Sequence, residues 1–305
     1  MERRRLGAAG PELTVTGLGT APIGSDLSWA IWWGPQDEAD AVAAVHAALD
    51  AGAGWIDTAP FYGWGRAEEL VGRALAGRRD EVLLLTKCGT LPEPGAVSRE
   101  DNRPETIRAD LEASLRRLRT DYVDLLQIHD VDRSTPIEES WGAVQAAIEE
   151  GKVRFGGLSN HPADLVERAH AVAPVTSCQE QLSLLAGPQD PAVLELAPRL
   201  GIGLLAWAPL ASGFLVDGFD VETLHPDDFR RRSRLREQAP RIGRLRAFAE
   251  ARGRSLRELA IAWVLAQPGV TAAIVGARNA GEAAAIVDGT DWRLSEADLA
   301  ELAAS

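Results

Sequence analysis

The sequence predicts a closed (β/α)8 TIM barrel, and two observations support this fold class. Short apolar runs alternate with amphipathic helical runs from end to end, and eight such units fit within the 305 residues. The apolar runs are bounded by polar or Gly/Pro positions, as expected for strands that are buried on both faces. An open doubly wound sheet made of the same units is the structural alternative. No linker divides the chain, so residues 1–305 are expected to form a single domain.

Eight strands are expected in chain order, each short and apolar. They cover residues 18–20, 55–59, 82–87, 123–129, 154–159, 177–181, 202–207 and 272–275. Helical periodicity between them predicts helices over residues 37–50, 67–76, 104–119, 138–150 and 190–200. Pro104 suits a first helical turn, and four glycines follow helix ends: Gly52, Gly77, Gly151 and Gly201.

Three segments depart from this regular spacing. Residues 5–17, centred on Gly10-Pro11, are typical of a short N-terminal β-hairpin that caps the barrel floor. Insertions at residues 24–36 and 212–240 follow the first and the seventh strand. Barrel enzymes build their active sites from loops at the C-terminal ends of the strands. Both insertions are therefore expected as extra loops or helices on the functional face.

Composition argues against several classes of function. Hydrophobic residues make up 46% of the chain and charged residues 25%, as in an ordinary globular protein. The net charge of −13 argues against a nucleic-acid partner, because phosphate binding needs a basic surface. No stretch approaches the roughly 18 apolar residues of a membrane span, and residues 1–10 lack the apolar core of a signal peptide. Cys88 and Cys178 show no metal or redox spacing, so we expect buried thiols in a cytoplasmic protein.

Four ionisable side chains lie at or just beyond the ends of three neighbouring strands. Asp57 is in the second strand and Tyr62 in the loop after it, Lys87 ends the third strand, and His129 ends the fourth. Taken singly, each could be a turn cap or a satisfied core residue. Burying an unpaired charge is very costly, so we expect the four to converge at one rim of the barrel.

Such a group suits carbonyl reduction. A free phenol has a pKa near 10 and donates its proton poorly at neutral pH, but a cationic lysine beside it lowers that pKa. Asp57 would hold Lys87 charged, and His129 would offer an N–H to the carbonyl oxygen of the substrate. The sequence has no carboxylate pair with glycosidase placement, no metal-ligand spacing and no Gly-x-Ser-x-Gly elbow. No metal is therefore expected.

The same residues stand in an ordered set of motifs. Residues 54–63 read GWIDTAPFYG, residues 121–129 read DYVDLLQIH, and residues 151–160 read GKVRFGGLSN. This set resembles the aldo-keto reductase family, with a likeness that runs from about residue 3 to about residue 302. The resemblance implies that Tyr62 is the general acid in reduction and the base in oxidation. It also implies that Lys87 and Asp57 tune Tyr62 and that His129 positions the carbonyl.

A nicotinamide cofactor is also implied by the resemblance. Ser159, Asn160 and Gln179 would hold the carboxamide, and Trp207 stands where many members carry a tyrosine that stacks on the nicotinamide ring. The remaining expected cofactor contacts are Gly19, Thr20 and Asp57, then Pro209, Leu210 and Ser212 near the pyrophosphate, and Gly276, Arg278 and Glu282 near the adenosine end.

NADP(H) is expected to be preferred, with NAD(H) possible. Arg278 offers an always-charged contact to the 2′-phosphate. Glu282 stands where many members place Arg or Gln, and Ile286 replaces an Asn. A carboxylate there would repel the phosphate, and its spacing from Arg278 also allows the two to pair. We therefore expect discrimination of only about ten- to hundredfold.

The expected partner is a small-molecule carbonyl compound or the corresponding alcohol. Trp29, Trp32, Trp33 and Trp64 are expected to wall the substrate pocket, with packing on the barrel rim as the alternative. Residues 230–236 carry five arginines on an expected helix, which is either a solvated face or a flap that reaches the cofactor phosphates. The sequence is compatible with a monomer.

Two other classes of function compete with the enzyme. A non-catalytic nicotinamide-binding regulatory protein on the same fold would bind the cofactor without turnover. A hydrolase or lyase on a (β/α)8 scaffold is the other alternative, because a fold alone does not fix a function. The complete set of Asp57, Tyr62, Lys87 and His129 favours the reductase.

Overall fold

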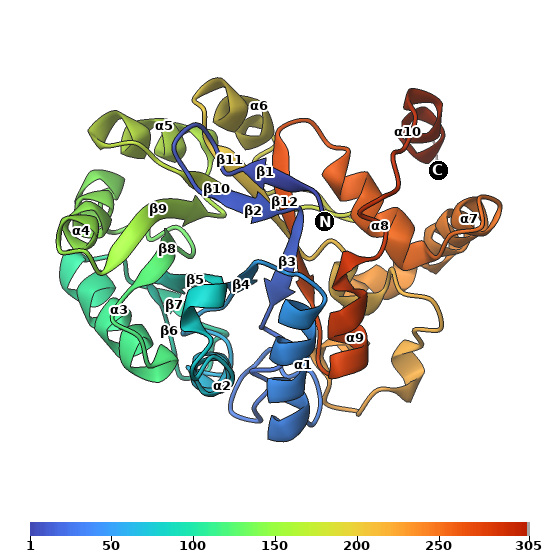
Figure 1. The fold of residues 1–305 in the computed structure, drawn as a ribbon, viewed down its shortest axis with the longest axis horizontal. Coiled ribbons are helices and arrows are strands. Elements are labelled where there is room, and N and C mark those ends of the chain that lie inside the picture. The colour runs from blue at the N-terminus through green and yellow to red at the C-terminus, as the bar shows by residue number, and fades with distance from the viewer. Residues whose placement is uncertain (304–305) are drawn as a thin grey trace.

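The computed structural model describes residues 1–303, and a barrel of eight parallel strands lies at its centre (Figure 1). Each barrel strand pairs with the next one along the chain, and the last pairs with the first, so the sheet is closed. The predicted (β/α)8 barrel is thus confirmed and the open sheet is not formed. The barrel strands are β3 (Thr16–Gly19), β4 (Trp55–Asp57), β5 (Leu83–Cys88), β8 (Val123–Ile128), β9 (Val153–Ser159), β10 (Ser177–Gln181), β11 (Gly203–Trp207) and β12 (Val270–Gly276).

Helices alternate with these strands and surround the barrel (Figure 1). The five helices expected from the sequence are present, with ends that differ by at most two residues. Pro104 opens its helix as predicted, and left-handed glycines such as Gly151 (φ 74°) and Gly201 (φ 70°) follow helix ends. The helices are α1 (Glu38–Asp50), α2 (Arg66–Ala74), α3 (Pro104–Leu118), α4 (Ile137–Glu149), α5 (Ala163–Val172), α6 (Ala192–Arg199), α7 (Ala239–Glu250), α8 (Leu256–Leu265), α9 (Ala280–Ala284) and α10 (Glu296–Ala303).

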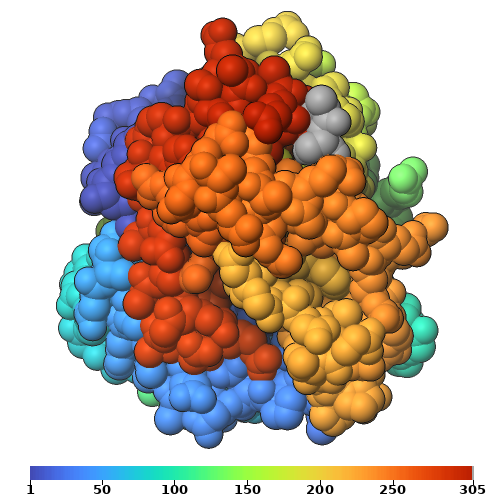
Figure 2. All heavy atoms as spheres, turned by 90° about the vertical axis from the view of Figure 1, so that its right-hand side faces the viewer, coloured from blue at the N-terminus to red at the C-terminus, as the bar shows by residue number. Residues whose placement is uncertain are grey.

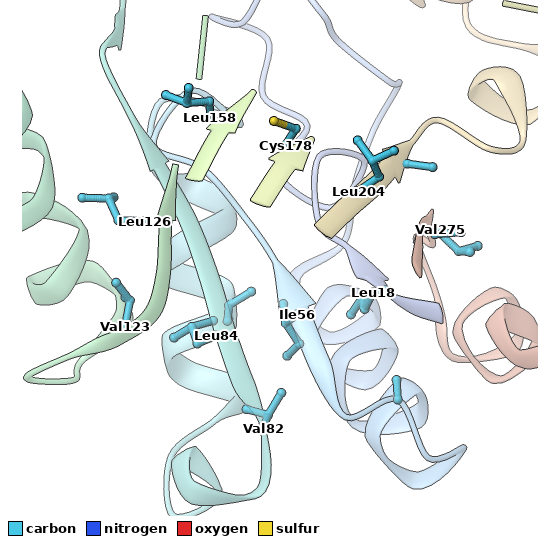
Figure 3. Packing of buried hydrophobic residues seen from close by; sticks show 14 of the residues in the cluster. Leu18, Ile56, Val82, Leu84, Val123, Leu126, Leu158, Cys178, Leu204 and Val275 are labelled. Carbon is cyan, nitrogen blue, oxygen red and sulfur yellow. The ribbon is translucent and has the colours of Figure 1, made fainter. Parts of the chain in front are cut away.

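The main hydrophobic core lies between the barrel and its helices. Every barrel strand contributes to it, and Figure 3 shows the set Leu18, Ile56, Leu84, Leu126, Leu158, Cys178, Leu204 and Val275, one residue from each strand. These side chains pack with helix residues such as Ala44, Val71 and Leu111. Both cysteines are free and buried, as the sequence predicted.

An antiparallel hairpin of β1 (Arg3–Arg5) and β2 (Glu12–Thr14) closes the N-terminal end of the barrel. Leu6 and Leu13 are each 1% exposed and belong to the cluster that fills the barrel interior, together with Trp55, Leu85, Leu125, Leu205, Ala272 and Ile274. Gly7 has a φ of 65°, and a Cβ there would lie 2.5 Å from the carbonyl oxygen of Gly201. The hairpin therefore caps the floor, as predicted, and leaves the opposite end for chemistry.

The segment after β11 is irregular, and here the sequence prediction was wrong in part. Instead of one helix over residues 230–236, the chain forms two 3₁₀ turns, η4 (Phe229–Arg232) and η5 (Arg234–Gln238). Ser233 separates them because its backbone is extended (φ −71°, ψ 135°) and its side chain accepts from Leu235 N–H. Two further turns precede them, η2 (Ala211–Gly213) and η3 (Val221–Thr223). In Figure 2 this part of the chain, in gold and orange, spreads over one side of the molecule.

A few short elements complete the fold. A hairpin of β6 (Thr90–Leu91) and β7 (Arg99–Glu100) follows β5 and was not predicted, because two-residue strands carry no readable periodicity. Short 3₁₀ turns also occur at η1 (Arg79–Glu81) and η6 (Ala285–Val287). Within residues 1–303, no helix combines the length and the apolar character that a bilayer crossing requires.

Candidate active site

A buried ion pair lies at the C-terminal end of the barrel, between β4 and β5. The Nζ of Lys87 donates to Asp57 Oδ1 at 2.6 Å, to the carbonyl oxygen of Thr58 at 3.0 Å and to the Tyr62 hydroxyl at 3.1 Å. Lys87 is fully buried and Asp57 is 1% exposed. Three of the four residues singled out in the sequence therefore converge, and all three ammonium donors have acceptors.

Two glutamines complete the hydrogen bonding of Asp57. Gln179 Nε2 donates to Asp57 Oδ2 at 2.9 Å, and Gln127 Nε2 approaches the same oxygen at 3.5 Å. Gln179 Nε2 also lies 3.3 Å from Gln127 Oε1. Sequence reasoning missed Gln127. Its inward place on β8, two residues before His129, was the available signal, because inward positions repeat every second residue.

His129 follows β8 and completes the group. Its main-chain N–H donates to the carbonyl oxygen of Cys88 at 3.0 Å, which fixes it beside the end of β5. The imidazole packs edge-on against Tyr62, with ring centroids 5.9 Å apart. Burial first, and then the charge of Lys87, lower the pKa of His129 well below its ordinary value, so the ring is neutral at pH 7. Its Nδ1 is buried and has no hydrogen-bond partner among residues 1–303.

Burial dominates the acidity of Tyr62. Desolvation of the phenolate raises the pKa of Tyr62, and the ammonium of Lys87 lowers it without cancelling that effect. Asp57 raises the pKa further. Desolvation of the ammonium is the largest single influence on Lys87 and lowers its pKa, but the charges and hydrogen bonds of Asp57 and Tyr62 together raise this pKa above its ordinary value. The sequence prediction that Lys87 lowers the pKa of Tyr62 has the correct sign for that contact. It omitted the larger effect of burial.

The residues expected near a carboxamide lie together at the ends of β9, β10 and β11. Ser159 Oγ donates to the carbonyl oxygen of Gln179 at 3.1 Å. Asn160 adopts a left-handed backbone (φ 57°), and its Oδ1 accepts from the indole N–H of Trp207 at 3.0 Å. Its Nδ2 donates to Asp130 Oδ1 at 3.0 Å. Asp130 was not singled out in the sequence.

Strained backbone marks the neighbouring loops. Ala208, Ala211 and Ser212 all have positive φ, of 54°, 47° and 56°. Non-glycine residues in this region cost free energy and are concentrated at functional sites. Pro209 and Leu210 lie between Ala208 and Ala211 in the chain.

Gly19 and Thr20 lie on the other side of the ion pair, at the end of β3. Gly19 pairs in register with both Asp57 and Gly276. The main-chain N–H and the hydroxyl of Thr20 both donate to the carbonyl oxygen of Asp57, each at 3.0 Å. Thr20 therefore tethers the strand end that carries the catalytic candidate Asp57.

Arg278 ties the end of β12 to the first insertion. Its guanidinium donates to the carbonyl oxygens of Trp33 (2.7 Å) and Pro35 (2.5 Å) and to Gln36 Oε1 (3.0 Å). Glu282 does not pair with this guanidinium. It accepts from the main-chain N–H of Arg278 at 2.9 Å and from Asn279 Nδ2 at 2.9 Å. Glu282 therefore contacts Arg278, as the spacing allowed, but through the main-chain N–H of Arg278 and not through its guanidinium.

The four tryptophans expected around the pocket divide into two pairs. Trp29 packs on Phe61 and Tyr62, with ring centroids 5.3 and 6.1 Å apart, and Trp64 packs on Phe61 at 5.4 Å. Trp32 and Trp33 contact the segment after β11, and Trp33 also packs against the cluster of Trp29 and Phe61. Their rings lie 4.8 Å from His225 and Phe229, and the guanidinium of Arg230 lies over Trp33. The first pair is near Tyr62, and the second joins the two insertions.

The arginine-rich segment is not one solvated face. Arg230 is 7% exposed and forms a bidentate pair with Asp228, which is 1% exposed. Arg231 and Arg236 both bind the carboxylate of Glu222. The main-chain N–H of Phe229 also donates to the carbonyl oxygen of Trp32 at 3.1 Å, so the segment is fastened across the first insertion. Within residues 1–303, no group of three or more His, Cys, Asp or Glu residues could hold a metal ion.

Comparison with known proteins agrees with this arrangement. Residues 17–305 match the model of the Aldo/keto reductase family. The chain is 35% identical to aldo-keto reductase YhdN of Bacillus subtilis, over 99% of this chain and 92% of that protein. It is also similar to the structure of glycerol dehydrogenase AKR11B4 from Gluconobacter oxydans, with a TM-score of 0.84 and 33% identity over 99% and 94% of the two chains.

A second solved structure, aldo-keto reductase AKR11C1 from Bacillus halodurans, gives a TM-score of 0.80 and 26% identity over 100% of this chain and 96% of that one. The family model spans the barrel, both insertions, and the four residues Asp57, Tyr62, Lys87 and His129. The chain therefore belongs to the aldo/keto reductase family.

Proposed function

We propose that this protein is an NADP(H)-linked carbonyl reductase and alcohol dehydrogenase in which Tyr62 is the general acid and base. Its family membership makes it an oxidoreductase that acts on small-molecule carbonyl compounds with a nicotinamide cofactor. The observation that carries the finer proposal is the contact of one buried ammonium, Lys87, with both Asp57 and the Tyr62 hydroxyl.

The contacts of these residues support the following mechanism. The bound cofactor supplies or accepts the hydride at the carbonyl carbon. In reduction, the Tyr62 hydroxyl gives its proton to the carbonyl oxygen as negative charge develops there, and Lys87 stabilises the phenolate that remains. Neutral His129 can donate an N–H to the same oxygen and hold the carbonyl in place. In oxidation the tyrosinate accepts the alcohol proton, so each proton and hydride is accounted for in both directions.

The residues present fit a nicotinamide cofactor. His129 Nδ1 and the indole nitrogen atoms of Trp29 and Trp33 are buried without a hydrogen-bond partner among residues 1–303. Unpaired buried donors are costly, and a polar ligand would satisfy them. Ser159, Asn160 and Gln179 would hold the carboxamide. Trp207 would flank the nicotinamide ring, and Pro209, Leu210 and Ser212 would border the pyrophosphate.

A modest preference for NADP(H) over NAD(H) is part of the proposal. Arg278 would contact the 2′-phosphate, but its guanidinium is already shared among carbonyl oxygens of the first insertion. Glu282 lies one turn away and opposes an added negative charge. These two features support a preference near the lower end of about ten- to hundredfold.

The aromatic surroundings indicate the kind of substrate. Phe61, Trp29 and Trp64 form one cluster beside Tyr62. Flat apolar faces of this kind suit apolar, aromatic or sugar-like aldehydes and ketones, with the indole N–H of Trp29 as a donor for a substrate oxygen.

The test compares the two tyrosines of the chain, Tyr62 and Tyr122. Tyr62→Phe should retain NADPH binding but lose about 10²–10⁴-fold in the rate of aldehyde reduction, because it removes the proton donor. Tyr122→Phe is the matched control, because Tyr122 stacks between Arg79 and Arg154 away from the ion pair. Full activity in the Tyr62 variant would refute the mechanism. A wild-type protein that binds NADPH but reduces no aldehyde in a broad panel would favour the non-catalytic nicotinamide-binding regulator.

A further inference from the structure

A short relay of hydrogen bonds joins three strand ends behind the proposed nicotinamide site. The indole N–H of Trp207 donates to Asn160 Oδ1 at 3.0 Å. The amide Nδ2 of Asn160 donates to Asp130 Oδ1 at 3.0 Å and to the carbonyl oxygen of His129 at 3.2 Å. The three side chains follow or end β8, β9 and β11, so no short sequence motif contains them.

The chemistry of the relay gives Asp130 control over its direction. An asparagine amide has a donor end and an acceptor end of nearly the same shape, and it can turn over. A carboxylate only accepts, so it fixes the donor end of Asn160 toward Asp130 and the acceptor end toward Trp207. An indole N–H only donates. If the amide turned over, two donors would face each other and Trp207 would lose its partner.

We propose that Asp130 is a positioning residue that, through Asn160, holds the indole of Trp207 in the orientation that flanks the nicotinamide ring. This inference rests on the proposed function, since it assigns Trp207 and Asn160 to the cofactor. Asp130 itself touches neither substrate nor cofactor. Its role depends on its negative charge, which keeps the acceptor end of Asn160 toward the indole.

The surroundings of Asp130 make this charge sensitive to pH. Burial raises the pKa of Asp130 to about 7, against the opposing effect of the Asn160 hydrogen bond. Glu100 on β7 raises this pKa and Lys87 on β5 lowers it. Two further groups face Asp130 and have their own pKa raised by it: Glu180 on β10 and Tyr62 after β4. As pH falls through about 7, Asp130 gains a proton, and of the two acceptors of Asn160 Nδ2 the carbonyl oxygen of His129 is left to favour this direction of the amide.

The experiment uses Asp130→Asn, which keeps the size of the side chain and removes the charge. The first measurement is the indole N–H resonance of Trp207 in an NMR spectrum of the protein without cofactor, assigned with Trp207→Phe. We expect a changed position and faster solvent exchange in Asp130→Asn. Asp121→Asn, which changes an exposed acid just before β8 at the opposite end of that strand, is the matched control and should leave the resonance unchanged. Urea unfolding confirms that each variant is folded.

The second measurement is the Kd of NADPH from pH 6 to pH 8. The wild type should bind about three- to tenfold more weakly at the acid end, as expected for loss of about one hydrogen bond. The Kd of Asp130→Asn should exceed that of the wild type about three- to tenfold at pH 8 and approach it at pH 6, where the wild-type carboxyl group is protonated. Trp207→Phe should show the same loss, and the double variant should be no worse than either single one, because both substitutions break one relay.

The outcomes separate this inference from the proposed function. An unchanged Trp207 resonance in Asp130→Asn overturns the inference, even where NADPH binds and aldehydes are reduced. So does a ratio of the two Kd values, Asp130→Asn to wild type, that stays the same from pH 6 to pH 8. A changed resonance in a protein that does not bind NADPH supports the relay and overturns the proposed function instead.

Discussion

Replacing Lys87 by methionine tests the electrostatics of the site most directly. The Nζ of Lys87 lies 3.1 Å from the Tyr62 hydroxyl, and two unit charges at that distance attract by about 5 kcal/mol at an effective dielectric constant near 20. That energy is an upper limit, because Asp57 offsets part of the field of Lys87. We therefore expect Lys87→Met to raise the pKa of Tyr62 further above its ordinary value.

Two assays measure this shift. Oxidation of an alcohol needs the tyrosinate, so the oxidation rate increases as Tyr62 loses its proton. This increase should occur at a higher pH in Lys87→Met than in the wild type. Phenolate absorbance gives a readout independent of activity, and a Tyr122→Phe background isolates Tyr62, because the chain has two tyrosines. Lys152→Met is the matched control, since Lys152 is the only other lysine and pairs with Glu112 and Glu150 at the surface.

Stability must be followed in the same variants. Removing Lys87 alone leaves a buried carboxylate and should cost roughly 3–5 kcal/mol. The double variant Lys87→Met/Asp57→Asn removes both charges and should recover most of that loss. In this double variant the pKa of Tyr62 should rise less than it does in Lys87→Met. If Tyr62 titrates at the same pH in Lys87→Met and in the wild type, the ammonium does not act on the phenol and the proposed mechanism fails.

Three other perturbations test separate parts of the structure. Arg278→Ala should remove most of the preference for NADPH over NADH, and Glu282→Gln should widen it. The preference is measured as the ratio of the Kd values of the two cofactors. Equal ratios in the wild type and both variants would exclude both residues from the 2′-phosphate site. Arg117→Met should lower the free energy of unfolding by roughly 2–4 kcal/mol in urea, because it strands the fully buried Glu68 while Arg117 itself is 23% exposed. The adjacent exposed Arg116→Met is its control, and an equal loss there would contradict the assignment. Leu13→Ala should cost about 2–5 kcal/mol, because Leu13 fills the barrel floor at 1% exposure; a loss below about 1 kcal/mol would mean that the hairpin does not seal the barrel.

Some parts of the site were readable in the sequence because each depends on local pattern. Asp57, Lys87 and His129 interrupt or end apolar strands, and a closed barrel brings the ends of neighbouring strands together. Tyr62 was singled out with them because it lies in the loop after the second strand, and the structure brings its hydroxyl to Lys87. The expected helix over residues 230–236 did not form, although arginine is a good helix former, because the side chains of Asp228 and Ser233 accept from backbone N–H groups and cap separate turns.

The sequence by itself determined the barrel, its floor and the convergence of Asp57, Lys87 and His129, because periodicity and strand order are encoded residue by residue. Only the tertiary structure decided how these groups behave. Burial reverses the expected acidity of Tyr62, Arg278 is engaged by the first insertion, and Asp130 meets Trp207 through Asn160 although the three come from separate strand ends. Desolvation and hydrogen-bond direction depend on every atom around a group. No local pattern records those atoms, since they come from distant parts of the chain.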